Sequence, residues 1–155
     1  MNISKFTQKS VQAVQDLEKV AYEYGNQEIE QEHLLYTLLT QEDSLILKLI
    51  EKMEINKDYF IDTVKKALDA KVKVSGGELR FGQYLNKALV NAEDEAKAMG
   101  DEYVSVEHLF LALLKQPSKE MKDLFKTYGI TSTTHNSISE HLKVHSDCRI
   151  LTLSY

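Results

Sequence analysis

Apolar residues recur three or four positions apart along most of the 155-residue chain, which is the spacing of an amphipathic helix. One stretch places five of them on one side of a helix: Leu85, Ala88, Leu89, Ala92 and Ala96. An earlier stretch places three on the matching side: Val14, Leu17 and Ala21. Gly25 and Gly100 follow these stretches, and glycine readily adopts the left-handed conformation that ends a helix. The pattern therefore predicts helices that end near these two glycines.

The chain repeats itself with an offset of 75 positions. The phrase EIEQEHLLYTLLTQ at 28–41 returns as EYVSVEHLFLALLKQ at 102–116. Across the 50 pairs from 6/81 to 55/130 there are 14 identities and no gap, whereas unrelated sequences of average composition would share about 3. The sequence therefore contains a duplicated unit.

Each copy predicts four helices. The second helix begins near the Glu-His-Leu phrase, with Ser105 as N-cap and Glu107 in the first turn, where a negative charge suits the helix dipole. The third helices are expected at 44–53 and 119–128, and the fourth at 57–70 and 132–144. Gly129 suits the turn after the third helix, but Glu54 stands there in the first copy, so that turn must be built differently or carry strain.

These elements predict an all-α fold, in which two pseudo-twofold-related four-helix repeats form one compact domain of about eight helices. We expect a first repeat at 1–70, a linker at 71–79 containing two adjacent glycines, a second repeat at 80–144, and a tail at 145–155 that fits neither repeat. A unit of about 70 residues has little core of its own, so the repeats should share one. The seam between them is a natural place for a groove.

Composition narrows the function. The net charge of −5 and the lack of a basic run argue against nucleic-acid binding. The polar N-terminus is unlike a signal peptide, and the chain contains no stretch of about 18 apolar residues that would span a membrane. The single cysteine, Cys148, cannot form an internal disulfide and is interpreted as an incidental thiol. A cytoplasmic protein is expected.

No motif in the sequence indicates catalytic chemistry. There is no Gly-x-Ser-x-Gly elbow and no Gly-Lys-Ser/Thr phosphate loop. Glu32 and His33 are adjacent on a helix, so their side chains point about 100° apart and do not readily chelate one ion. The same holds for Glu107 and His108. We expect no enzyme, no metal and no cofactor in this chain.

Binding is the remaining class. Glu32 and Glu107 start equivalent helices, preceded by Asn26-Gln27 in one copy and Asp101-Glu102 in the other. One interpretation is that these residues are helix caps and solvated charge. The other is a pair of acidic corners flanking an apolar seam, which would suit a cationic or extended peptide.

The same residues resemble a known family. FTQKSVQAV near the start, EHLLYTLL and then DEYVSVEHLFLALL are similar to the N-terminal domain of Clp-family AAA+ unfoldases, over roughly residues 1–144. The double repeat is also that family's arrangement. QEIEQEHLLYTLLTQED, KVKVSGG and AEDEAKAMGDEYVSVEHLFLALL look most like the ClpB disaggregase branch.

The resemblance implies a mobile helical domain on a hexameric ATPase ring that engages unfolded or aggregated polypeptide or an adaptor protein. In ClpB-like domains the polar residues of this role match Thr7, Asp101 and Glu107, and Leu89 matches a position of the apolar groove. In ClpC-like domains the glutamates that accept arginine-phosphate marks match Glu32 and Glu107. A carboxylate clamps a guanidinium well. ATP is expected for ATPase modules that this sequence lacks, so a fragment, a truncated product or a stand-alone domain is expected.

Two alternatives stay open. The first is the adaptor-binding N-terminal domain of a ClpC- or ClpA-type subunit of a Clp protease. The second is a stand-alone small metal-binding or enzymatic protein.

Overall fold

The computed structural model describes residues 3–144, with side chains for residues 3–142. The expected tail at 145–155 lies outside these residues. The first repeat contains α1 (Gln8–Glu23), α2 (Gln31–Thr40), α3 (Leu45–Lys52) and α4 (Lys57–Asp69). The second contains α5 (Gln83–Ala98), α6 (Val106–Lys115), α7 (Lys119–Thr127) and α8 (Ser132–Val144). The predicted all-α fold is confirmed for the described range, and the third and fourth helices lie within one residue of their expected bounds.

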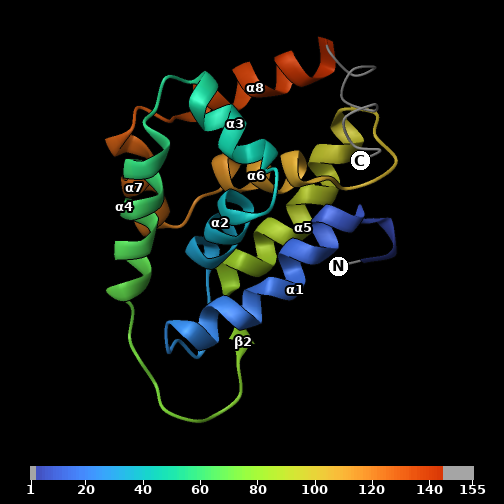
Figure 1. The fold of residues 1–155 in the computed structure, drawn as a ribbon. Helices are drawn as coiled ribbons and strands as arrows, with labels where there is room; N and C mark the ends of the chain where they lie inside the picture. Colours follow the sequence, from blue (N-terminus) through green and yellow to red (C-terminus); the bar gives the residue numbers. More distant parts are fainter. Residues whose placement is uncertain (1–2, 145–155) are drawn as a thin grey trace.

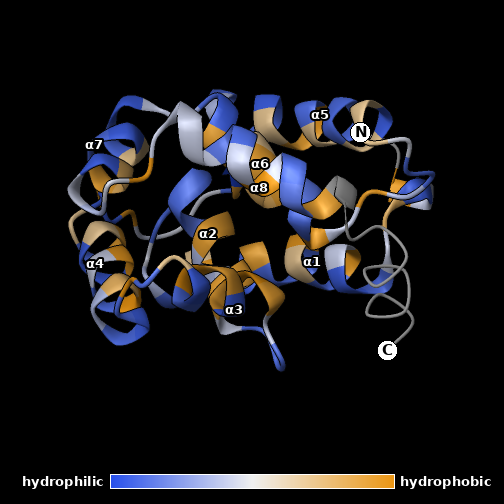
Figure 2. Cartoon of the chain, turned by 90° about the horizontal axis from the view of Figure 1, so that it is seen from above, coloured by the Kyte–Doolittle hydropathy of each residue, from blue (hydrophilic) through white to orange (hydrophobic). Residues whose placement is uncertain are grey.

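The second helix of each repeat lies at the centre of the domain. Figure 1 shows α2 and α6 in the middle, with the other helices around them. Leu34, Leu35, Leu38, Leu109 and Phe110 are completely buried, and a single apolar cluster runs through both repeats. In Figure 2 the hydrophobic faces of the outer helices turn inward and their polar faces turn outward. The repeats therefore share one core, as their small size requires.

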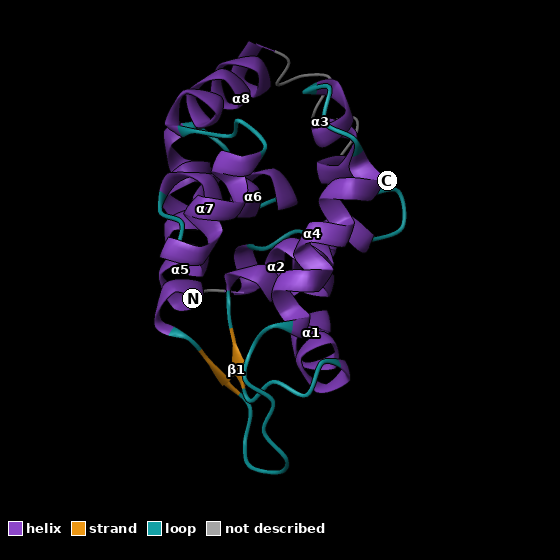
Figure 3. Ribbon diagram, turned by 90° about the vertical axis from the view of Figure 1, so that its left-hand side faces the viewer, coloured by secondary structure: helices purple, strands orange, loops and turns teal. Residues whose placement is uncertain are grey.

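Two short parallel pairings join the repeats crosswise. Strand β1 (Glu28–Ile29) pairs with β2 (Arg80–Phe81), as Figure 3 shows. An isolated bridge joins Phe6 to Val104. Ile29 opposite Phe81 and Phe6 opposite Val104 are the same pairing displaced by 75 positions. In both, the residue before the N-cap of the first helix of one repeat pairs with the residue before the N-cap of the second helix of the other. The duplicated sequence thus folds with pseudo-twofold symmetry, and the sequence pattern gave no sign of these pairings.

A buried glutamine adds a polar link between the repeats. The side-chain amide of Gln31 donates to the carbonyl oxygens of Tyr84 and Gln116, each at 3.1 Å, and its oxygen accepts from the backbone N–H of Ser118 at 2.8 Å. All three partners belong to the second repeat, and Gln31 itself is fully buried. A buried amide that satisfies three backbone groups fixes their relative positions.

The turn after the third helix is the same in both repeats. Gly129 has φ of 72° and Glu54 has φ of 61°. In each case the next N–H bonds back five residues, from Ile130 to Phe125 and from Ile55 to Ile50. Glu54 therefore adopts a left-handed conformation that costs a non-glycine residue free energy, so of the two expected possibilities the strained turn is correct.

Among residues 3–144, no helix has both the length and the apolar character needed to cross a membrane.

Candidate functional site

The two Glu-His-Leu phrases begin their helices at corners built in the same way. In the first corner (Asn26, Glu30, Glu32 and His33), the ring Nδ1 of His33 accepts from the N–H of Glu30 at 2.9 Å. In the second corner (Thr7, Asp101, Ser105, Glu107 and His108), Nδ1 of His108 accepts from the N–H of Ser105 at 2.8 Å. Each histidine thus closes a capping box at the start of its helix.

The other ring nitrogen of each histidine also has a partner. Nε2 of His33 lies 2.9 Å from the side-chain oxygen of Asn26, and Nε2 of His108 lies 2.8 Å from a carboxylate oxygen of Asp101. Because Nδ1 is an acceptor in both rings, the proton lies on Nε2 and is donated outward. The histidines therefore act as buried helix-start residues. Within the described residues, no group of three or more His, Cys, Asp or Glu side chains is placed to hold a metal ion.

In the first corner, burial and neighbouring charges shift the pKa values of His33 and Lys71. Burial, together with the nearby Lys71 ammonium, lowers the pKa of His33 to about 4, so the ring is neutral near pH 7. Burial by itself also lowers the pKa of Lys71, but the adjacent carboxylates of Glu30 and Glu32 outweigh it and raise the pKa above its ordinary value. Lys71 is therefore a stable cation in contact with the corner.

Glu32 is the acidic centre of this corner. Its side chain is 4% exposed, and its Oε2 lies 2.9 Å from the Nζ atom of Lys71. The same Nζ lies 2.7 Å from Oε2 of Glu30. An ammonium bound between two carboxylates makes short, charge-assisted hydrogen bonds. The sequence did not point to Lys71, because it lies in the expected linker and far from Glu32 in the chain.

The segment that carries Lys71 lies against the first corner along several residues. The amide of Asn26 donates to the carbonyl of Val72 at 3.1 Å, and the N–H of Val74 donates to the carbonyl of Gly25 at 2.8 Å. The Nζ atom of Lys73 donates to the carbonyl of Tyr24 at 2.8 Å. The first corner therefore holds a non-helical, lysine-containing segment of its own chain by both backbone and side-chain contacts.

The second corner brings together three of the five predicted site residues. Thr7 caps α1 by accepting from the N–H of Ser10 at 3.3 Å, and its own N–H donates to the carbonyl of Val104 at 3.0 Å. Asp101 is 21% exposed, whereas Glu107 is buried and accepts from the hydroxyl of Ser105 at 3.0 Å. Thr7 and Ser105 directly follow the two residues of the Phe6–Val104 bridge.

Exposed apolar side chains stand on the same two segments. Tyr103 is 52% exposed and Ile3 is 45% exposed. The second corner thus combines a partly buried carboxylate with exposed apolar side chains.

The other two predicted residues lie elsewhere. Glu32 belongs to the first corner, and Leu89 lies on α5 with 1% of its surface exposed, inside the shared core. The structure therefore does not bring Glu32 together with Glu107, and it does not place Leu89 on an open surface.

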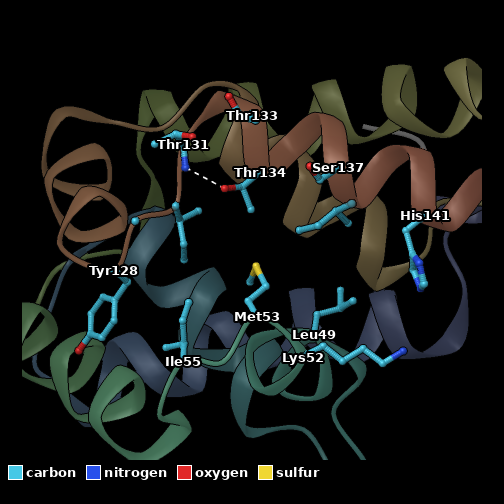
Figure 4. A pocket seen from close by; sticks show the side chains of 13 residues that line it. Leu49, Lys52, Met53, Ile55, Tyr128, Thr131, Thr133, Thr134, Ser137 and His141 are labelled. Atoms are coloured by element: carbon cyan, nitrogen blue, oxygen red, sulfur yellow. Dashed lines mark hydrogen bonds between the residues drawn. The ribbon is translucent and has the colours of Figure 1, made fainter.

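An open hollow of about 470 Å³ lies on the seam between the repeats. Figure 4 shows Leu49, Met53 and Ile55 of the first repeat facing Thr134, Ser137 and His141 of the second. The N–H of Thr131 donates to the hydroxyl of Thr134 at 3.0 Å on its upper rim. This hollow matches the expectation of a groove at the seam, but none of the five predicted site residues lines it.

Comparisons with known proteins agree with this architecture. The ClpB chaperone of Nitratidesulfovibrio vulgaris is 38% identical over 123 residues, which is 76% of this chain and 14% of that protein. The chain spans 14 to 16% of the length of the first ClpB relatives it matches.

Solved structures show the same fold at lower identity. The Hsp104 N-terminal domain of Candida albicans superposes with a TM-score of 0.77 and 22% identity, covering 90% of this chain and 91% of that one. A complex of the ClpV N-domain with a VipB peptide superposes with a TM-score of 0.67 and 22% identity, covering 92% and 85%.

The Clp repeat (R) N-terminal domain matches residues 5–128, which include both corners and seven of the eight helices of the described range. The resemblance drawn from the Glu-His-Leu phrases is thereby confirmed, and the chain belongs to the Clp repeat N-terminal domain family.

Proposed function

We propose that this domain binds segments of unfolded or aggregated polypeptide without catalysis, and that the second corner is where a bound segment docks. The observation that carries this proposal is the seating of Lys71 in the first corner, 2.9 Å from Glu32 and 2.7 Å from Glu30. The fold already holds a lysine-containing segment at one of its two equivalent corners. The other corner has the same histidine capping geometry, and we propose that it takes a segment of another chain.

The residues of the first corner that contact the Lys71 segment have counterparts 75 positions later in the second corner. The carbonyl of Gly25, which accepts from Val74, corresponds to that of Gly100. Asn26, whose amide donates to the carbonyl of Val72, corresponds to Asp101, whose carboxylate accepts instead. Glu32 corresponds to Glu107. The second corner therefore has a backbone carbonyl and two carboxylates at the equivalent positions, and these are the group types that bind a lysine or arginine side chain on a segment with extended backbone.

In this proposal the five predicted site residues have different roles, because they differ in burial and in position. Asp101, 21% exposed, would contact the ligand. Glu107, which is buried behind it, would add negative charge, and Thr7 would hold α1 against the Val104 segment. Leu89 would act through the packing of α5 in the core. Glu32 would bind Lys71 within the chain. We expect an affinity of about micromolar or weaker, since such a corner buries few anchors.

The family supports a wider role for such binding. A ClpV N-domain forms a complex with a VipB peptide, and the curated relatives named above are ClpB chaperones. We propose that this domain serves a ClpB-type disaggregase in the cytoplasm, passing polypeptide to its AAA+ ring, where ATP would be used. Adaptor binding of the ClpC or ClpA type is the competing function.

The test is a backbone-amide NMR titration of the 155-residue chain with a permanently unfolded, reduced and carboxymethylated model protein. Shifts at Thr7, Asp101 and Glu107 that diminish in the Asp101→Asn variant are the expected result. Shifts confined to the first corner or the seam hollow would overturn the assignment of the second corner. No shifts at millimolar ligand would overturn binding of unfolded chains and favour the adaptor function.

A further inference from the structure

A second open groove lies within the second repeat. It has a volume of about 690 Å³ and is formed by the start of α5, the end of α6, α7 and the turn into α8. Its lining includes Leu114, Phe125 and Pro117, with Tyr84 on the rim at 50% exposure. A concave apolar surface of this size is typical of sites that hold one or two side chains of a partner.

The floor of this groove is held rigid from the first repeat. The buried amide of Gln31 bonds the backbone of Tyr84, Gln116 and Ser118, which are the points where α5 begins, α6 ends and α7 begins. The groove is therefore preformed, and little ordering free energy would be lost when a ligand binds.

Four lysines surround the groove: Lys87, Lys115, Lys122 and Lys126. All four are exposed, and the groove has no acidic residue in its lining. Lys115 lies 3.9 Å from Glu95. Among the described residues the other three lysines make no ion pair within 4.0 Å, and the Nζ atom of Lys87 lies 5.5 Å from the ring centroid of Tyr84. This concentration of positive charge contrasts with the net charge of −5 of the whole chain.

The duplicated sequence shows that the helices do not need these lysines. At the equivalent positions the first repeat has Gln12, Thr40, Leu47 and Glu51, and it forms the same helices. Lys122 and Lys126 are also four residues apart on α7, so they repel each other by about 0.2–0.5 kcal/mol. The second repeat therefore maintains a charge arrangement that its fold does not require.

The turn into α8 also contributes positive charge to the groove. Thr131 and Ser132, at the N-terminus of α8, line the groove together with the lysines. The N-terminal end of a helix carries partial positive charge and favours an anion nearby. The lysines and the N-terminus of α8 therefore both favour a negatively charged group in the groove.

We propose that this groove is a docking site for an acidic peptide segment of a partner protein, in which an aromatic or aliphatic side chain packs on Tyr84 and the apolar floor while flanking carboxylates pair with the lysines. The groove is lined by none of the residues of the second corner. The domain thus has a separate surface of opposite electrostatic character, and a partner docked there would not cover the residues of the second corner.

The test uses fluorescence anisotropy with the 155-residue chain and three labelled peptides. The first is Asp-Glu-Phe-Asp-Glu, the second replaces Phe with Gly, and the third is Ser-Gln-Phe-Ser-Gln. The groove variant combines Lys87→Gln with Lys126→Glu, which installs the residue types of the first repeat. The matched control combines Lys97→Gln with Lys65→Glu, exposed lysines outside the groove that give the same change in net charge.

The first peptide should bind and the other two should bind at least about fivefold more weakly, because each lacks one of the two required features. The groove variant should weaken binding of the first peptide about tenfold, since it removes one ion pair and reverses another. The control double and Asp101→Asn should leave it unchanged within about twofold.

Four results would overturn the proposal. Equal loss in the groove variant and the control would mean that binding follows net charge alone. Equal binding of the peptide without Phe would mean that the apolar floor is not used. Failure of the acidic peptide to bind, or equal binding of the neutral one, would mean that the lysines do not select it. Circular dichroism of both doubles checks that their helices are intact.

Discussion

Asn26 and Asp101 stand 75 positions apart and make the same contact, each accepting a hydrogen bond from Nε2 of a buried histidine, at 2.9 Å and 2.8 Å. They differ by one negative charge. The first repeat therefore shows how the uncharged residue is accommodated at this position. The first corner therefore shows which contact an asparagine can make with the histidine if it replaces Asp101 in the second corner.

Asp101→Asn is expected to separate binding from folding. The asparagine oxygen can accept from His108 as Asn26 does from His33, so the free energy of unfolding should change by less than about 0.5 kcal/mol. Affinity for a lysine-containing unfolded chain should fall up to about fivefold, the usual contribution of one partly exposed ion pair. Anisotropy and urea unfolding measure the two quantities. The matched control is Asn26→Asp; if it lowers affinity as much as Asp101→Asn does, the second corner is not the site.

Lys71→Met should destabilise the domain through Glu32. The substitution keeps the length of the side chain but leaves the buried carboxylate of Glu32 without its ammonium partner. Because the side chain of Lys71 is itself 14% exposed, the expected loss is about 2 kcal/mol, below the range for a fully buried pair. Lys66→Met is the control, since Lys66 pairs with Asp62 on the surface and should contribute less than about 0.5 kcal/mol. Similar losses in both variants would show that the first corner does not need its cation.

Much of this fold could be predicted because the duplicated sequence shows many of its helix patterns twice. The glycines at 25 and 100, the N-cap at Ser105 and the helix bounds all follow from local rules of backbone conformation and dipole charge. The pairing of Phe6 with Val104 could not be predicted, because a single bridge leaves no alternating pattern in the sequence.

The candidate site was harder to predict for a different reason. Both Glu32 and Glu107 begin helices, which says nothing about burial, and the structure shows both to be buried. Their partners come from loops distant in the chain, as with Lys71 and Glu32. The four lysines around the second groove, Lys87, Lys115, Lys122 and Lys126, lie on three separate helices, so only the folded chain brings them together.

Glu54→Gly is expected to stabilise the domain. Glu54 has φ of 61°, where a side chain costs about 1–2 kcal/mol, and glycine loses about 0.5–1 kcal/mol of that gain through the entropy of the unfolded chain. The net gain should be about 0.5 kcal/mol, seen as a higher urea midpoint. Gly129→Ala, at the equivalent turn, should have the opposite effect. If Glu54→Gly destabilises the protein, a contact of the Glu54 side chain must outweigh its strained backbone.

His33 should make the domain less stable in mild acid. Its pKa falls from 6.5 to about 4 in the folded chain, chiefly through burial and then through Lys71. Between these two values the unfolded chain binds the proton more readily, so the contribution of the neutral ring is complete above pH 6.5 and is lost as the pH falls toward 4. The shift of about 2.5 pH units corresponds to about 3 kcal/mol over that window.

Urea unfolding at several pH values between 4 and 7 tests this prediction against His33→Gln. Glutamine is the residue that usually closes a capping box, and its amide can accept from Glu30 and donate to Asn26 without titrating. The variant should be less stable at pH 7, because the smaller side chain packs less well, but its free energy of unfolding should decline less on acidification. Titrating carboxylates elsewhere affect both proteins alike, so the difference between the two slopes isolates His33. Parallel slopes would mean that the ring is protonated in the folded corner as easily as in water, and that the burial of His33 beside Lys71 does not hold it neutral.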